Sequence, residues 1–176
     1  MLRICFTALF AALIAGGTFI SVPIGPVPII FQNFFVLLAG LVLGPKHGTA
    51  AVVLYLAAGI LGAPVFAGFT GGITRFAGPT GGFLIGYLLM AVLAGIIAGS
   101  YDKKLSRKRL ITAVFLGLLS VYLPGLLWLK VSAGLSWEKA FAAGFIPFIP
   151  GDILKGIIAV LITPNLRKNA ADHLNG

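Results

Sequence analysis

The stretch that decides the fold covers residues 80–99, T-G-G-F-L-I-G-Y-L-L-M-A-V-L-A-G-I-I-A-G, and it contains no charged side chain. An α-helix needs about 20 mostly apolar residues to cross the hydrocarbon core of a bilayer. Five similar runs predict further spans, giving approximately 4–20, 29–43, 47–61, 80–99, 110–129 and 147–163. We therefore expect an all-α integral membrane protein, a bundle of six transmembrane helices, in a single membrane domain over residues 1–176 with a cytoplasmic tail at 164–176.

Composition supports a membrane protein. Of the 176 residues, 59% are hydrophobic and 10% are charged, more apolar surface than a soluble domain of this size can bury. The net charge of +9 could suggest nucleic acid as a partner. Five of the cations, however, stand in one short stretch between apolar runs: Lys103, Lys104, Arg107, Lys108 and Arg109. Their clustering indicates membrane topology rather than nucleic-acid binding.

The loops predict the orientation. The second and third spans are short, and we expect them to form a hairpin through G-P-K-H-G at 44–48. With a cytoplasmic N-terminus, most cations fall inside: Arg3, Lys46, the five-cation cluster, Arg167 and Lys168. Because cytoplasmic loops are enriched in Lys and Arg, both termini are predicted to be cytoplasmic in a multi-pass protein of the cell membrane.

Two features predict a polar site within the bundle. The glycine-rich segment 62–82 carries one charged residue, Arg75, while Asp152 and Lys155 stand three apart inside the last apolar run. An ionisable side chain in a membrane span is costly unless it is paired or faces a cavity. The glycines alone could also be explained by turn geometry, but together these residues indicate a pocket for a small polar molecule.

The sequence predicts no enzyme. Metalloprotease, serine-hydrolase and metal-ligand motifs are missing, and so is a G-x-x-x-x-G-K-[ST] phosphate loop. We expect no metal and no cofactor. Any active uptake would need an ion gradient or an ATPase partner.

The first span carries small residues four apart, Ala8 with Ala12 and Ala11 with Ala15. Such spacing places them on one helix face and allows close approach by another helix. They could pack within the bundle or against another subunit.

Several motifs in order resemble the BioY family, the biotin-binding S components of energy-coupling factor (ECF) transporters. They are P-I-G-P-V-P at 23–28, Gln32, G-P-K with Gly48, Tyr55, G-A-P-V-F at 62–66, G-P-T-G-G at 78–82 and P-G-D-I-L-K at 150–155. The resemblance covers nearly the whole chain except the tail. Phe83 stands where the family often has tyrosine.

The resemblance implies a six-helix subunit that captures biotin near the extracellular side without altering it. It also implies a transmembrane coupling subunit and two cytoplasmic ATPases as partners, with Ala8 and Ala12 facing the coupling subunit. Two alternatives stay open: an S component for another small vitamin, and an intramembrane enzyme or self-sufficient transporter.

Biotin matches the polar residues. Asp152 could accept hydrogen bonds from the ureido N–H groups and Lys155 could donate to the ureido carbonyl, with Gln32 supplementing either contact. Arg75 is the candidate for the carboxylate, since guanidinium binds carboxylates through two hydrogen bonds. The aromatic candidates that could enclose the ligand are Tyr55, Phe66, Phe69 and Tyr87. The alternatives are a structural Asp152–Lys155 pair, Lys155 at the carboxylate, Arg75 at lipid headgroups, and core packing or lipid contact for the aromatic rings.

Overall fold

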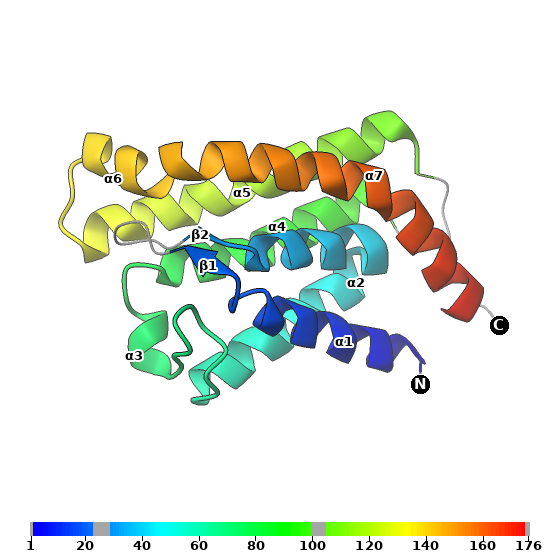
Figure 1. Cartoon of the computed structure of the whole chain (residues 1–176), viewed down its shortest axis with the longest axis horizontal. Coiled ribbons are helices and arrows are strands. Elements are labelled where there is room, and N and C mark those ends of the chain that lie inside the picture. Colours follow the sequence, from blue (N-terminus) through cyan, green and yellow to red (C-terminus); the bar gives the residue numbers. More distant parts are fainter. Residues whose placement is uncertain (1, 23–28, 100–104, 175–176) are drawn as a thin grey trace.

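The structure, a computed structural model, describes residues 2–22, 29–99 and 105–174 (Figure 1). Its long helices are α1 (Leu2–Gly16), α2 (Gln32–Ile60), α4 (Gly81–Ala98), α5 (Arg107–Ser132) and α7 (Ile149–Leu174). The short elements are β1 (Ser21–Val22), β2 (Ile29–Ile30), α3 (Ile73–Phe76), α6 (Trp137–Gly144) and the 3-10 helix η1 (Ile146–Phe148). The two strands pair antiparallel, and the P-I-G-P-V-P motif at 23–28 lies outside the described residues.

The helix α2 is a hairpin of two arms. Gly44 interrupts it with a φ of 76° and a ψ of −177°, a left-handed conformation that costs glycine little. Pro45 follows, and its ring does not fit the interior of a continuous helix. The two arms run in opposite directions (Figure 1). Together with α1, α4, α5 and α7 they make six long helical segments within the described ranges, which confirms the predicted six-helix bundle.

Length and composition allow four segments to cross a membrane. They are α2, α4, α5 and the continuous apolar segment Trp137–His173, while α1 is apolar but shorter. Large side chains such as Phe115, Leu123 and Leu161 are more than half exposed on the outer surface. That pattern suits a lipid environment, and the chain is a multi-pass membrane protein. Residues 164–174 continue α7 through Pro164.

Glycines set the distance between neighbouring helices. A side chain at Gly86 of α4 would meet the backbone of Val121 in α5, and one at Gly40 of α2 would meet the backbone of Ala91 in α4. Membrane helices lack a hydrophobic force between them and associate through such close backbone packing. The α2–α4–α5 layer is therefore the core on which the site is built.

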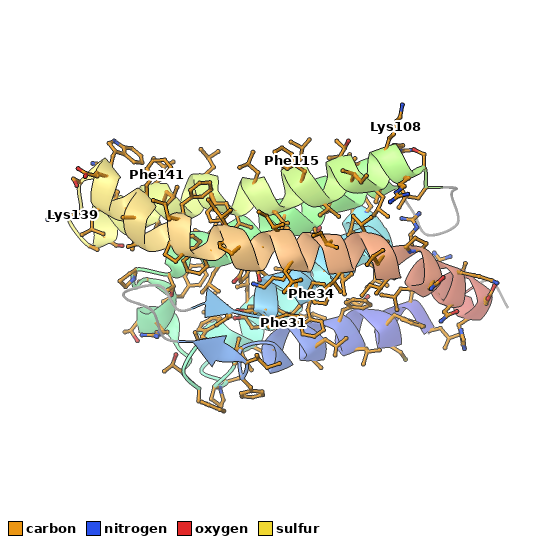
Figure 2. All side chains as sticks on the ribbon, turned by 45° about the horizontal axis from the view of Figure 1, so that its top comes forward. Phe31, Phe34, Lys108, Phe115, Lys139 and Phe141 are labelled. Atoms are coloured by element: carbon orange, nitrogen blue, oxygen red, sulfur yellow. The ribbon has the colours of Figure 1, made fainter. Side chains whose placement is uncertain are left out.

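The two ends of the bundle differ. Both termini and the start of α5 lie at one end, whereas α3, α6 and the β1–β2 pair lie at the other (Figure 1). Lys108 and Lys139 mark these opposite ends in Figure 2.

Arg167, expected only as a cytoplasmic cation, has a structural role at the end that holds the termini. It is buried and its Nη1 donates to the carbonyls of Leu41 at 2.9 Å and Gly99 at 3.0 Å. Carbonyls at helix C-termini have no partner within their own helix. Arg167 therefore ties α7 to the ends of α4 and of the first arm of α2.

Candidate ligand-binding site

A buried polar network centres on Asp152, in the first turn of α7. Its Oδ1 accepts a hydrogen bond from Nδ2 of Asn33 at 2.9 Å, and its Oδ2 accepts one from the Tyr122 hydroxyl. Asn33 stands at the start of α2 and Tyr122 in the middle of α5, so three helices meet at this carboxylate. Only 7% of Asp152 is exposed, so its carboxylate meets these protein partners rather than water.

Lys155 lies one turn further along α7 and completes the network. Its Nζ donates to Oδ1 of Asn33 at 2.7 Å and to the Ile30 carbonyl at 2.9 Å, and lies 3.4 Å from Oδ1 of Asp152. The ammonium also lies 5.9 Å from the centre of the Phe31 ring. A buried charge is tolerated when it is paired and hydrogen-bonded. Asp152 and Lys155 thus form a neutral unit that fastens α7 to β2 and α2.

A small cavity of about 50 Å³ lies beside this network. Four of the eight candidate ligand-binding residues line it, namely Gln32, Phe66, Tyr87 and Asp152; other lining residues are Ile30, Asn33, Ala67, Thr80, Phe83, Leu84, Val121, Tyr122 and Phe148. Sites for small molecules usually enclose about 300 Å³ or more. The cavity is therefore smaller than such sites, and a ligand of that size would fit only if its walls moved.

Gln32 and Tyr55 bring unpartnered polar atoms to this region. Gln32 is fully buried, yet neither its amide oxygen nor its amide nitrogen has a hydrogen-bond partner within the described residues, and the same holds for the Tyr55 hydroxyl. The Gln32 side chain neighbours the Tyr55 hydroxyl, but the two groups do not meet with the geometry of a hydrogen bond. Buried polar groups in native proteins almost always have partners. An amide that lines a cavity and has no hydrogen-bond partner among the described residues is suited to bind a polar ligand or water.

Aromatic rings form one wall of the cavity. Phe66 packs edge-on against Tyr55, with ring centres 5.7 Å apart. It also lies so close to Gly59 that any side chain at Gly59 would collide with its ring. Phe83, the position where the family often has tyrosine, lines the same cavity and brings no hydroxyl to it.

Two candidates lie away from the cavity. Arg75 is exposed on α3, and its Nη2 lies 3.4 Å from the carbonyl of Ala67, a residue of the cavity wall. Phe69 is 69% exposed and packs against Phe19 with ring centres 4.8 Å apart. Arg75 thus contacts a residue of the cavity wall from outside the cavity, and the outward position of Phe69 does not match the expectation that it encloses the ligand.

Sequence reasoning missed Asn33 and Tyr122. Each is a polar side chain in a predicted membrane span, the signal that also singled out Asp152. Asn33 stands beside Gln32 in the sequence and is separated from Asp152 by 119 positions, so only the packing of α2 against α7 reveals the contact.

The two predicted interface residues lie on the outside of α1. Ala8 and Ala12 are exposed, whereas Thr7, Phe10 and Ile14 turn into the bundle. The face bearing Ala8 and Ala12 is thus not used for packing among the described residues.

Comparison with known proteins connects this arrangement to a family. The BioY family matches residues 1–172. The probable biotin transporter BioY of Pyrococcus horikoshii is 46% identical over 95% of this chain and 97% of that protein. The biotin transporter BioY of Thermotoga maritima is 40% identical over 96% of this chain and 97% of that protein.

Solved structures agree with the sequence relatives. The crystal structure of the S-component for biotin from an ECF-type ABC transporter superposes with a TM-score of 0.82, with 34% identity over 94% of this chain and 90% of that chain. FolT bound with folic acid superposes with a TM-score of 0.66 at 20% identity, over 94% of this chain and 92% of that chain, and it shares the fold. From its sequence, its six-helix bundle and these matches, the chain belongs to the BioY family.

Proposed function

We propose that this chain is the S component that captures biotin for an ECF-type importer and performs no chemistry on it. The observation that carries the proposal is the buried Gln32 amide, which lines a cavity beside the Asp152–Lys155 network and has no hydrogen-bond partner in the part of the chain that the structure describes. We infer that the ligand is biotin because the BioY relatives are named biotin transporters and the similar solved structure is an S-component for biotin.

The ureido ring of biotin matches this polar corner. It offers two N–H donors and one carbonyl acceptor, while a glutamine side chain offers one carbonyl acceptor and two N–H donors. Gln32 can therefore exchange two hydrogen bonds with the ring. Oδ2 of Asp152, which accepts one hydrogen bond from Tyr122, has a free lone pair for the second ureido N–H.

Lys155 keeps its proposed ligand role as the source of positive charge beside the ring. Its ammonium already has three acceptors within 3.4 Å. It could donate to the ureido carbonyl by giving up one of these acceptors, such as the carbonyl of Ile30, a residue that lines the cavity. Tyr55, Phe66 and Tyr87 would enclose the apolar part of the vitamin.

Arg75 is proposed to bind the carboxylate at the other end of the ligand. Its guanidinium contacts the backbone of the cavity wall at Ala67 and is otherwise exposed. A ligand with its ureido ring at Gln32 would extend its valeryl chain toward this part of the wall. Closure of α3 over the carboxylate would then bring the arginine to its partner.

The partners and the orientation belong to the same proposal. The exposed Ala8–Ala12 face of α1 would pack against a transmembrane coupling subunit, and two cytoplasmic ATPases would supply the energy, because this chain has no phosphate loop. The end with both termini and Lys108 would face the cytoplasm, following the bias of Lys and Arg to that side. The cavity would then open on the extracellular side.

A thermal-shift comparison tests the ligand. We expect biotin to raise the melting temperature of the purified chain, because a ligand that binds only the folded state stabilises it. Thiamine and riboflavin at the same concentration should leave it unchanged. No shift with biotin, or an equal shift with thiamine, would contradict the proposal.

A further inference from the structure

A long apolar groove runs along the outside of the bundle between α5 and α7. Ile111, Phe115 and Leu119 of α5 face Ile153, Ile157 and Leu161 of α7 across it, and each of the six is between 46% and 66% exposed. Gly156 of α7 also lines the groove. Because it has no side chain, α7 can pack close to Val114 and Leu118 of α5. The volume of the groove is about 470 Å³.

The dimensions of the groove fit a lipid acyl chain. The stretch of α5 from Arg107 to Tyr122 rises about 22 Å at about 1.5 Å per residue, which exceeds the roughly 15 Å depth of one leaflet. Both helices belong to segments apolar enough to cross a membrane. An open apolar channel at this depth is filled by hydrocarbon, because water there would find almost no polar group to bind.

Positive charge stands at one end of the groove. Arg107 is the cation that lines it, it is exposed, and it forms no hydrogen bond or ion pair with any residue that the structure describes. It also begins α5, where unpaired backbone N–H groups and the helix dipole favour an anion. Ser106 caps only the amide of Arg109. The charge and the helix start both complement a phosphate.

We infer that the groove is a binding site for an anionic phospholipid, with its headgroup at Arg107 and one acyl chain between α5 and α7. The chain would run from Arg107 toward Tyr122 and Asp152, which line the far end of the groove. Those two residues share a hydrogen bond and separate the groove from the ligand cavity. The acyl chain would occupy the part of the groove that leads to these two residues.

Native mass spectrometry of the whole chain in detergent tests the inference. Phosphatidylglycerol and phosphatidylcholine with identical acyl chains are added in equal amounts, and the bound fractions are compared. We expect phosphatidylglycerol to be preferred about fivefold, the usual effect of one basic residue near an anionic lipid surface. Equal binding of the two lipids by the unmodified chain would overturn the inference.

Two variants and a control locate the site. Arg107→Gln should abolish the preference, and Arg107→Glu should reverse it. Lys108→Gln, a matched change on the same helical turn at a residue that does not line the groove, should keep it. If Arg107→Gln keeps the preference, or Lys108→Gln loses it equally, the headgroup assignment is wrong.

A third variant tests the acyl-chain part. Ile157→Trp fills the groove from an exposed position and should reduce binding of both lipids. Unchanged binding of both lipids would place the acyl chain elsewhere and contradict the inference. All these positions are exposed, and retained helical circular dichroism checks that each variant is folded.

Discussion

Gln32 and Asn33 are adjacent in the sequence but differ in what they contribute. Asn33 donates to Asp152 and accepts from Lys155, whereas Gln32 has no hydrogen-bond partner within the described residues although it is fully buried. A buried polar group without a partner destabilises the folded state by about 1–3 kcal/mol. Ligand binding therefore explains Gln32 better than stability does, whereas Asn33 is explained by its hydrogen bonds to Asp152 and Lys155.

The two residues give opposite predictions on replacement by leucine. Gln32→Leu should leave the melting temperature of the unliganded chain unchanged or higher and should weaken biotin binding at least tenfold. Asn33→Leu should lower both the melting temperature and the affinity for biotin, because it removes hydrogen-bond partners from the buried charges of Asp152 and Lys155. Melting curves and biotin titrations of both variants check this, and a Gln32→Leu protein that melts much lower with unchanged affinity would contradict it.

Asp152→Asn separates the ligand role of the network from its structural role. The asparagine keeps the shape but leaves the Lys155 charge uncompensated and removes a charge-assisted contact worth about 1.5–3 kcal/mol. We expect biotin affinity to fall at least tenfold, which corresponds to about 1.4 kcal/mol. Isothermal titration calorimetry measures the loss, and Asp172→Asn, an exposed position at the far end of α7, is the matched control. Parent-like affinity combined with a sharply lower melting temperature would favour a purely structural pair.

Arg75 is tested together with its proposed chemical partner. Arg75→Ala should strongly reduce the affinity for biotin. Amidating the biotin carboxylate should reduce the affinity of the unmodified chain but should reduce that of the variant little further, since both changes remove the same contact. Arg75→Lys should give an intermediate loss, because a point charge lacks the planar two-pronged geometry. Additive losses would place Lys155 or another group at the carboxylate, and unchanged affinity of Arg75→Ala would leave Arg75 at the lipid headgroups.

At the scale of elements, the long helices were the most predictable part of the fold. Apolar runs define them, because the bilayer imposes a minimum length and the backbone must satisfy its own hydrogen bonds there. The reversal within α2 was readable from Gly44 and Pro45. The short helices α3 and α6 were not predicted, since they lie in segments whose conformation depends on neighbouring helices. The indole of Trp128, for example, donates to the Gly78 carbonyl at 2.9 Å and holds the loop before α4.

The outer face of α1 gives a prediction about assembly. Changing Ala8 and Ala12 together to leucine should block close approach by a coupling helix and leave the ligand cavity intact, because both side chains point away from the bundle. Co-purification with the coupling subunit and ATP-dependent uptake should be lost, while the biotin-induced thermal shift is kept. Normal assembly of this variant would contradict the interface, and loss of biotin binding would indicate packing within the S component. Val53 and Leu54, which are exposed on the second arm of α2, offer matched control positions for alanine replacement.

At the scale of the whole molecule, the site was only partly predictable from the sequence. Asp152 and Lys155 stood out because ionisable residues in a span require a reason. The contact of Asn33 with Asp152 and the burial of Gln32 depend on how α2, α5 and α7 pack, which no local pattern encodes. Arg167 shows the same limit, since its charge indicated topology while its hydrogen bonds to the Leu41 and Gly99 carbonyls depend on the assembled bundle.

The small volume of the cavity, about 50 Å³, has a consequence for the speed of binding. A ligand larger than its cavity can enter only after the walls have opened, so the fraction of open molecules reduces the apparent affinity. If opening precedes binding, the observed association rate should stop rising at high biotin concentration and level off at the opening rate. Stopped-flow tyrosine and tryptophan fluorescence would show that plateau. An observed association rate that keeps rising linearly with biotin concentration would mean that opening of the cavity does not limit binding.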